Sequence, residues 1–115
     1  MLFIIIMIDS VYLYVIKKSF SDMIQNIQQS LVEINLWSVF VCYIFLSICI
    51  FYFIWNKNAS YKEAFLLGFL IYGIFDSTNY ALFHDWNFQL SLIDTLWGGT
   101  LFTSTLFFMK LIYLR

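Results

Sequence analysis

The sequence contains no proline and only four glycines, and charged residues make up just 11% of its length. A soluble domain of this size would usually carry about 25% charged residues and about 45–50% apolar ones. Here 63% of the 115 residues are hydrophobic, and 23% are aromatic. These proportions exclude an ordinary soluble domain and predict a small all-α integral membrane protein whose main partner is the lipid bilayer.

Several chemical motifs are also absent. The two cysteines, Cys42 and Cys49, lie in one apolar run, about 10 Å apart along a helix, which is too far for a disulfide within it. The sequence has no Ser-His-Asp, Cys-His or H-E-x-x-H arrangement, no glycine-rich phosphate loop and no basic patch for nucleic acid. These absences argue against soluble hydrolases, nucleotide-binding proteins and nucleic-acid partners, and no cofactor is expected.

Four apolar runs have lengths near the roughly 17–25 residues that a membrane-spanning helix needs. The predicted spans are residues 2–17, 36–55, 64–83 and 90–112, of which the first is short. Between the first two, apolar residues recur at spacings of three and four over residues 19–34, which predicts an amphipathic helix lying at the membrane interface or packed on the bundle. The predicted fold is one membrane domain, residues 1–115, with four transmembrane helices in a small bundle plus this interfacial helix.

The distribution of basic residues indicates an orientation. With four spans, both termini share one side of the membrane with the loop between the second and third spans. That side carries Lys57, Lys62, Lys110 and Arg115, whereas the other side carries Lys17 and Lys18. Because cytoplasmic loops carry an excess of Lys and Arg, the N- and C-termini are predicted to be cytoplasmic.

Two aspartates, Asp76 and Asp94, interrupt the third and fourth runs on either side of a short turn centred on Asp85. If these runs form an antiparallel helical hairpin, the two carboxyl groups lie at the same depth and can face each other. A third acid, Asp9, interrupts the first run and can reach the same layer. A carboxylate at the centre of a spanning helix costs roughly 2.5–3.5 kcal/mol on insertion scales, so such residues usually have a function.

Other polar or small residues share helical faces with these acids. Tyr72, Asp76 and Asn79 follow one another at spacings of four and three, and Trp97 follows Asp94 at a spacing of three. Small residues at Gly73, Gly98 and Gly99 are expected to let the helix backbones approach closely. The candidate ligand-binding or proton-binding residues are therefore Asp9, Tyr72, Asp76, Asn79, Asp94 and Trp97, with Gly73, Gly98 and Gly99 assigned to helix packing.

The leading hypothesis is that the acid cluster binds a proton, a cation or a small polar ligand. Because no Lys or Arg lies deep within a span to pair with these acids, at least one carboxyl group is expected to carry a proton at neutral pH. Alternatively, a cation with oxygen ligands, such as Ca²⁺, Mg²⁺ or Mn²⁺, neutralises the site. Four short helices enclose little volume, so a transporter of this kind would require a homo-oligomer.

The main alternative is a structural or assembly protein in which the Asp/Asn cluster only joins helices and the apolar exterior contacts other membrane proteins. In the fourth predicted span, small residues four positions apart, Gly99 with Thr103 and Thr100 with Ser104, would let helix backbones approach closely and let the threonine and serine hydroxyls bond across the contact. An interhelical hydrogen bond is worth about 0.6 kcal/mol on average, which does not cover the cost of burying a carboxylate. A lipid-directed membrane enzyme is disfavoured because no nucleophile or metal-ligand set is evident.

Two motifs resemble the signature of a known family. The motif Tyr72-Gly-x-x-Asp76-x-Thr78-Asn79, followed by Asp94-x-x-Trp97-Gly98, is similar to that of predicted four-span membrane proteins known mainly from bacteria (domain-of-unknown-function family 2177). The resemblance covers nearly the whole chain, with a first helix that begins later than is typical and Phe75 where Tyr is commoner. It implies the four-span fold and its topology but no particular activity.

Overall fold

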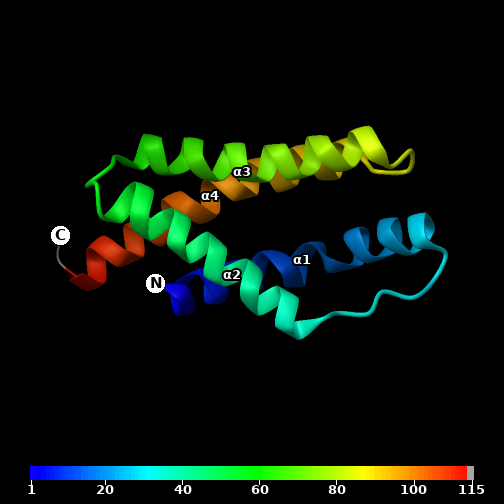
Figure 1. Cartoon of the computed structure of the whole chain (residues 1–115), viewed down its shortest axis with the longest axis horizontal. Helices are drawn as coiled ribbons and strands as arrows, with labels where there is room; N and C mark the ends of the chain where they lie inside the picture. The colour runs from blue at the N-terminus through cyan, green and yellow to red at the C-terminus, as the bar shows by residue number, and fades with distance from the viewer. Residues whose placement is uncertain (114–115) are drawn as a thin grey trace.

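The computed structural model describes residues 1–113 and consists of four long helices (Figure 1). They are α1 (Leu2–Gln28), α2 (Leu36–Ile50), α3 (Tyr61–Leu82) and α4 (Phe88–Tyr113), with a π-helical turn, η1 (Phe51–Trp55), continuing α2. The predicted all-α architecture is confirmed. Within residues 1–113, two helical stretches, Leu36–Trp55 and Tyr61–Leu82, are long and apolar enough to cross a membrane.

The first helix differs from the sequence-based expectation. We predicted a span over residues 2–17 and a separate amphipathic helix over residues 19–34, but α1 runs without a break to Gln28. Neither proline nor glycine lies within it, so nothing in the backbone interrupts the helix near Lys17. It ends where Gln29 adopts a left-handed conformation (φ 60°), and the chain then returns to α2 as a non-helical segment (Figure 1). The prediction of a separate amphipathic helix is therefore wrong, and residues 31–34 are not helical.

The helices α3 and α4 form the predicted antiparallel hairpin and lie side by side (Figure 1). Ser60 fixes the start of α3 through a capping box: its side chain accepts a hydrogen bond from the Glu63 N–H (3.2 Å), and the Glu63 carboxylate accepts one from the Ser60 N–H (2.8 Å). Residues 83–87 turn the chain back. The hairpin is thus folded about Asp85, as the sequence indicates.

The two backbones of this hairpin meet at glycine. A Cβ atom on Gly68 would collide with the Gly98 carbonyl group, and one on Gly98 would lie 2.5 Å from the Gly68 carbonyl oxygen. A Cβ on Gly99 would lie 2.6 Å from the ring of Phe65, whereas Gly73 faces only a Thr95 methyl group at 3.3 Å. Close backbone contact therefore depends most on Gly68 and Gly98, and Gly68 was not singled out from the sequence.

The hydroxyl groups near this contact do not bond across it. Thr103 donates to the Gly99 carbonyl (2.9 Å) and Thr100 donates to the Leu96 carbonyl (3.0 Å), both within α4. The carbonyl one turn earlier is the nearest acceptor for a helical threonine, so the side chain turns back onto its own helix. The prediction that the hydroxyls of Thr100 and Thr103 bond across the helix contact is therefore wrong.

An apolar core lies between all four helices, and the outside is also apolar. Ile5, Ile50, Leu101 and Phe102 are fully buried in the core. Large side chains nevertheless cover the surface, with Phe3, Trp37, Ile74 and Leu82 between 66% and 72% exposed. Extended apolar surface of this kind suits contact with lipid rather than water.

Candidate functional site

Asp9 joins three helices. It lies on α1 and is only 6% exposed. Its Oδ1 accepts a hydrogen bond from the Trp97 indole N–H of α4 at 2.7 Å, and its Oδ2 accepts one from the Tyr43 hydroxyl of α2. Both carboxyl oxygens therefore have partners on different helices. The second predicted span therefore contributes to the polar cluster through Tyr43.

Asp94 makes a second connection between α4 and α1. Its Oδ1 accepts a hydrogen bond from the Tyr12 hydroxyl at 2.9 Å, and the residue is 7% exposed. The Tyr12 ring also stacks on Trp97, with centroids 4.6 Å apart and an interplanar angle of 5°. Asp94 Oδ2 accepts no hydrogen bond from residues 1–113. The same carboxyl group neighbours that of Asp76 on α3.

Asp76 has a different environment although it belongs to the same layer. It lies on α3 at 1% exposure, and neither of its carboxyl oxygens has a hydrogen-bond partner among the described residues. Asp94 and Trp86 are its nearest polar neighbours and both interact with its carboxyl group, although neither meets the distance and angle limits of a hydrogen bond. The buried Trp86 indole N–H is likewise unpartnered in this part of the chain. Asp76 is the most completely buried acid and the least satisfied.

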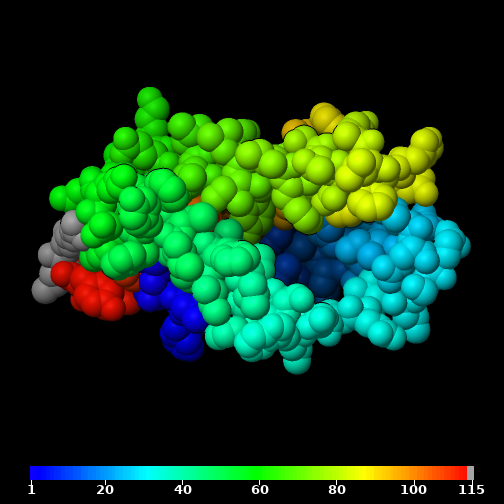
Figure 2. Space-filling view, in the orientation of Figure 1, coloured from blue at the N-terminus to red at the C-terminus, as the bar shows by residue number. Residues whose placement is uncertain are grey.

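A pocket of about 270 Å³ opens beside these acids. Its polar wall consists of Asp9, Tyr12, Cys42, Tyr72 and Asp94, and its apolar wall consists of Leu13, Leu46, Ile71 and Phe75. The space-filling view shows a hollow between α2 (teal) and the yellow-green part of α3, and dark-blue α1 forms the floor of this hollow (Figure 2). All four helices contribute lining residues, so the pocket depends on the assembled bundle.

A smaller cavity of about 160 Å³ lies on the other side of the α3–α4 hairpin. Asp76, Ser77, Ser91 and Thr95 supply its polar lining. Asp94 faces the first pocket and Asp76 faces this one, so the two neighbouring carboxyl groups lie between two cavities. Within residues 1–113, no group of three or more His, Cys, Asp and Glu side chains is arranged to hold a metal ion.

The structure brings most of the predicted site residues together. Asp9, Tyr72 and Asp94 line one pocket, Trp97 binds Asp9, and Asp76 neighbours Asp94. Asn79 does not join them: it lines neither cavity, and its side chain makes no hydrogen bond within the described chain.

Three residues of the site were missed from the sequence. Tyr12 shares a helical face with Asp9 at a spacing of three, which is a signal that could have identified it. Tyr43 is one of several polar-tipped residues in its run, and no pattern distinguishes it from Tyr52. Trp86 reaches the Asp76 region from the turn, where its ring contacts Phe20 and Phe75 edge-on.

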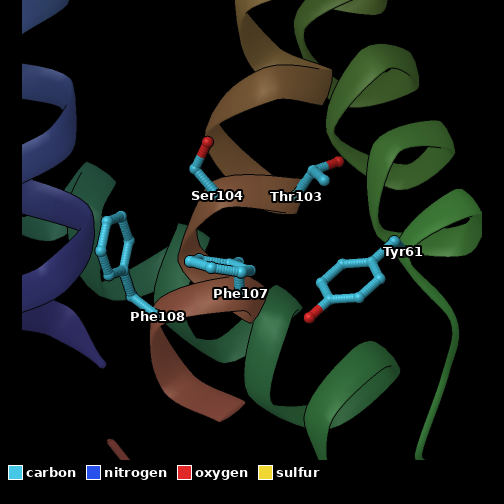
Figure 3. A pocket seen from close by; sticks show the side chains of 5 residues that line it. All are labelled: Tyr61, Thr103, Ser104, Phe107 and Phe108. Carbon is cyan, nitrogen blue, oxygen red and sulfur yellow. The ribbon is translucent and has the colours of Figure 1, made fainter. Parts of the chain in front are cut away.

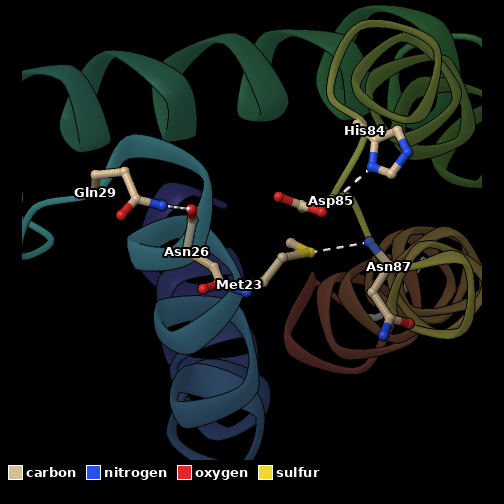
Figure 4. A network of polar contacts seen from close by, with 6 residues as sticks. All are labelled: Met23, Asn26, Gln29, His84, Asp85 and Asn87. Carbon is tan, nitrogen blue, oxygen red and sulfur yellow. Dashed lines mark hydrogen bonds and ion pairs between the residues drawn. The ribbon is translucent and has the colours of Figure 1, made fainter.

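Two further features lie at the ends of the bundle. A pocket of about 330 Å³ is lined by Tyr61 of α3 and by residues of α4, among them Thr103, Ser104 and Phe107 (Figure 3). At the opposite end, the Asn87 N–H donates to the Met23 sulfur at 3.1 Å and so holds the end of α1 against the turn (Figure 4). Neither feature contacts the acid cluster.

The fold and the site define a class: an all-α membrane protein with three buried acids, two of which are hydrogen-bonded between helices. The comparison with protein families agrees with this class. The family model described as "Predicted membrane protein (DUF2177)" matches residues 1–110, so the chain belongs to that family. Neither a curated protein nor a solved structure shows a significant match to the chain.

Proposed function

We propose that the protein crosses the bilayer four times and uses the Asp76–Asp94 pair to bind a proton, a cation or a small polar ligand. One observation carries this proposal: Asp76 is 1% exposed and neither of its carboxyl oxygens has a partner among the described residues. An ionised carboxylate buried in this way costs several kcal/mol unless a charge or hydrogen bond compensates it. A proton or a bound cation on Asp76 would supply that compensation.

A proton is the simplest species that fits. A protonated carboxyl group can donate a hydrogen bond to a neighbouring carboxylate, and two adjacent acids commonly share one proton. Asp94 is the electrostatic neighbour of Asp76 and has one oxygen, Oδ2, without a hydrogen bond from residues 1–113. Proton release from this pair would then alter the charge beside the pocket.

The proposed topology places both termini in the cytoplasm. The end of the bundle with the loop between η1 and α3 carries Lys57, Lys62 and Lys110, in line with the positive-inside bias. Lys110 lies over the Tyr61 ring (4.5 Å) and Lys57 over the Tyr52 ring (4.9 Å), positions that suit the membrane interface. A homo-oligomer is part of this proposal, because four short helices enclose little volume and the pocket of one chain measures only about 270 Å³.

The test is proton or cation flux into liposomes that contain the purified protein, with infrared spectroscopy of the same samples. We expect flux in the parent protein, an absorption band from a protonated carboxylic acid, and loss of both in Asp76→Asn. Asp85→Asn, at the exposed turn, is the matched control and should retain both. Absence of flux in the parent protein, or an unchanged band in Asp76→Asn, would refute the proposal.

A second function has its own support. The hydrogen bonds of Asp9 and Asp94 to Tyr43, Trp97 and Tyr12 join α1, α2 and α4, which is what a purely structural role requires. In that case the protein acts in membrane assembly with other proteins. It predicts that Asp9→Asn loosens the bundle while Asp76→Asn changes neither flux nor the proteins that co-purify.

A further inference from the structure

We propose that the pocket between α2 and α3 binds an organic ammonium group carried on an apolar body, which enters sideways from the bilayer. The inference rests on the proposed function, because it assigns a ligand class to the same acid cluster. Three features of the pocket lead to it: its charge, its aromatic wall and the position of its opening.

The charge of the pocket selects a cation. Asp9 and Asp94 are both in its wall, and no Lys, Arg or His of residues 1–113 lines it. The two oxygens of Asp9 are already occupied by Trp97 and Tyr43, so Asp9 supplies negative potential. Asp94 accepts one hydrogen bond, from Tyr12, and its carboxyl group supplies the direct contact with the ligand. Opposite charges at short range attract strongly where water is excluded.

The aromatic wall selects an organic ammonium group over a bare metal ion. Tyr12, Tyr72 and Phe75 line the pocket, and Tyr12 is held in place by its stack on Trp97. Cations carried by ammonium groups are attracted to the faces of such rings. Ca²⁺ and Mg²⁺ require several oxygen ligands, whereas Leu46, Phe75 and other apolar side chains form much of this wall. Its volume of about 270 Å³ is sufficient for a small organic cation.

The opening indicates the route. The hollow lies on the side of the bundle, between α2 and α3, and not at either end (Figure 2). Leu13, which lines it, is 44% exposed, and Phe75 is 55% exposed, so its rim is apolar. In the proposed membrane orientation this rim faces lipid. An amphiphile can therefore place its ammonium group at Asp94 while its apolar part remains in the bilayer. The hydroxyl of Tyr72, which has no hydrogen bond within the described residues, is available to an oxygen of the ligand.

The proposal can be tested by calorimetric titration of the purified protein in phosphatidylglycerol nanodiscs, which contain no ammonium lipid. Choline is the probe, and 3,3-dimethylbutan-1-ol, its uncharged isostere, is the control ligand. We expect saturable choline binding at least about tenfold tighter than binding of the alcohol, as a cation–aromatic site requires. Equal binding of the two ligands, or no choline binding, would overturn the proposal.

Variants locate the binding. Leu13→Trp should fill the rim of the pocket and reduce choline affinity at least about tenfold, as should Asp94→Asn. Leu92→Trp is the matched control because Leu92 is also about half exposed (51%) but lines the cavity on the other side of the hairpin. It should bind choline like the parent protein. Binding that survives both Leu13→Trp and Asp94→Asn in folded protein would assign choline to another place and refute the proposal.

The source of the ammonium group and the underlying function are separated by two further comparisons. If a lipid headgroup is the natural ligand, free choline should bind more weakly in phosphatidylcholine nanodiscs than in phosphatidylglycerol ones; equal affinity indicates a soluble ligand. Choline binding together with unchanged flux in Asp76→Asn would refute the proposed function alone. Loss of flux in Asp76→Asn without choline binding would refute the ligand assignment alone.

Discussion

In the α3–α4 hairpin the two backbones meet at Gly68 and Gly98, whereas α1 is connected to its neighbours through the side chains of Asp9 and Tyr12. Membrane helices associate in both ways, by close packing of small residues and by polar bonds across the contact. The hairpin therefore does not need the carboxyl group of Asp76 to hold its two helices together. The contacts of α1, in contrast, depend on the carboxyl groups of Asp9 and Asp94.

This difference divides the three buried acids into two groups. Asp9 and Asp94 accept hydrogen bonds from other helices, so a structural role accounts for at least part of their burial. Asp76 lies on the hairpin whose backbones already meet at Gly68 and Gly98, and it accepts no hydrogen bond from the described residues. Substitutions at the two kinds of contact should consequently differ in size and in what they affect.

The largest effect is expected from Gly68→Ala. The added Cβ would meet the Gly98 backbone, which cannot move aside as a flexible side chain can. Overpacking typically costs about 1–3 kcal/mol, and a backbone contact favours the upper part of that range. The free energy of unfolding, measured by titration with sodium dodecyl sulfate in mixed micelles, should fall accordingly.

Gly73→Ala is the control for the hairpin. Its Cβ would meet only the Thr95 methyl group at 3.3 Å, a contact that a small shift relieves. Alanine also favours helix over glycine by roughly 0.5–1 kcal/mol, so this variant should be about as stable as the parent. Equal loss of stability in Gly68→Ala and Gly73→Ala would contradict the idea that the backbones meet at Gly68.

The next effect is expected from Asp9→Ala. The change leaves the Tyr43 hydroxyl and the Trp97 indole N–H without their acceptor in the core. A buried donor left unsatisfied costs about 1–3 kcal/mol, so the same micelle titration should show a loss of that size. Asp9→Asn retains one acceptor oxygen and should lose less. If Asp9→Ala were as stable as the parent protein, the hydrogen bonds of Asp9 would contribute nothing to holding α1 in place.

A smaller effect is expected from Tyr12→Phe. It removes the hydroxyl that binds Asp94 but keeps the ring that stacks on Trp97. The loss should be near the average interhelical hydrogen bond in membranes, about 0.6 kcal/mol. Tyr14→Phe, two residues away at 76% exposure, should change the free energy of unfolding by nothing measurable. Equal effects of the two substitutions would remove the Tyr12–Asp94 bond from the account of how α1 is held.

Part of this architecture could be predicted from the sequence. The hairpin follows from two apolar runs around Asp85, and helical spacing places Asp76 and Asp94 at equal depth. The continuity of α1 could not be predicted in the same way, because the polar residues after Lys17 suggest a change of environment while the backbone has no reason to break. The spacing of apolar residues and the distribution of charged ones indicate where a helix lies. Its end is indicated only by a helix-breaking residue or a capping residue.

The partners of the acids were harder to predict than the acids. A carboxyl group in an apolar run is conspicuous because it is costly, and the sequence identifies it by composition alone. Tyr43 and Trp86 are ordinary aromatic residues in an aromatic-rich chain, and their roles arise from how the helices cross. Asn79 shows the converse: its spacing from Asp76 is right for one face, yet its side chain lies outside both cavities.

The smallest change in stability is expected from Asp76→Asn, although it should affect function the most. The carboxyl group of Asp76 accepts no hydrogen bond from residues 1–113, and the amide of Asn can still donate one to Asp94, so the substitution should cost little interhelical bonding. The free energy of unfolding should stay within about 0.5 kcal/mol of the parent value or rise, because a buried ionisable group is replaced by a neutral one. Flux in liposomes should be lost in the same preparation. A loss of stability as large as that of Asp9→Ala would instead show that Asp76 joins helices as Asp9 does, and the distinction between the two kinds of acid would fail.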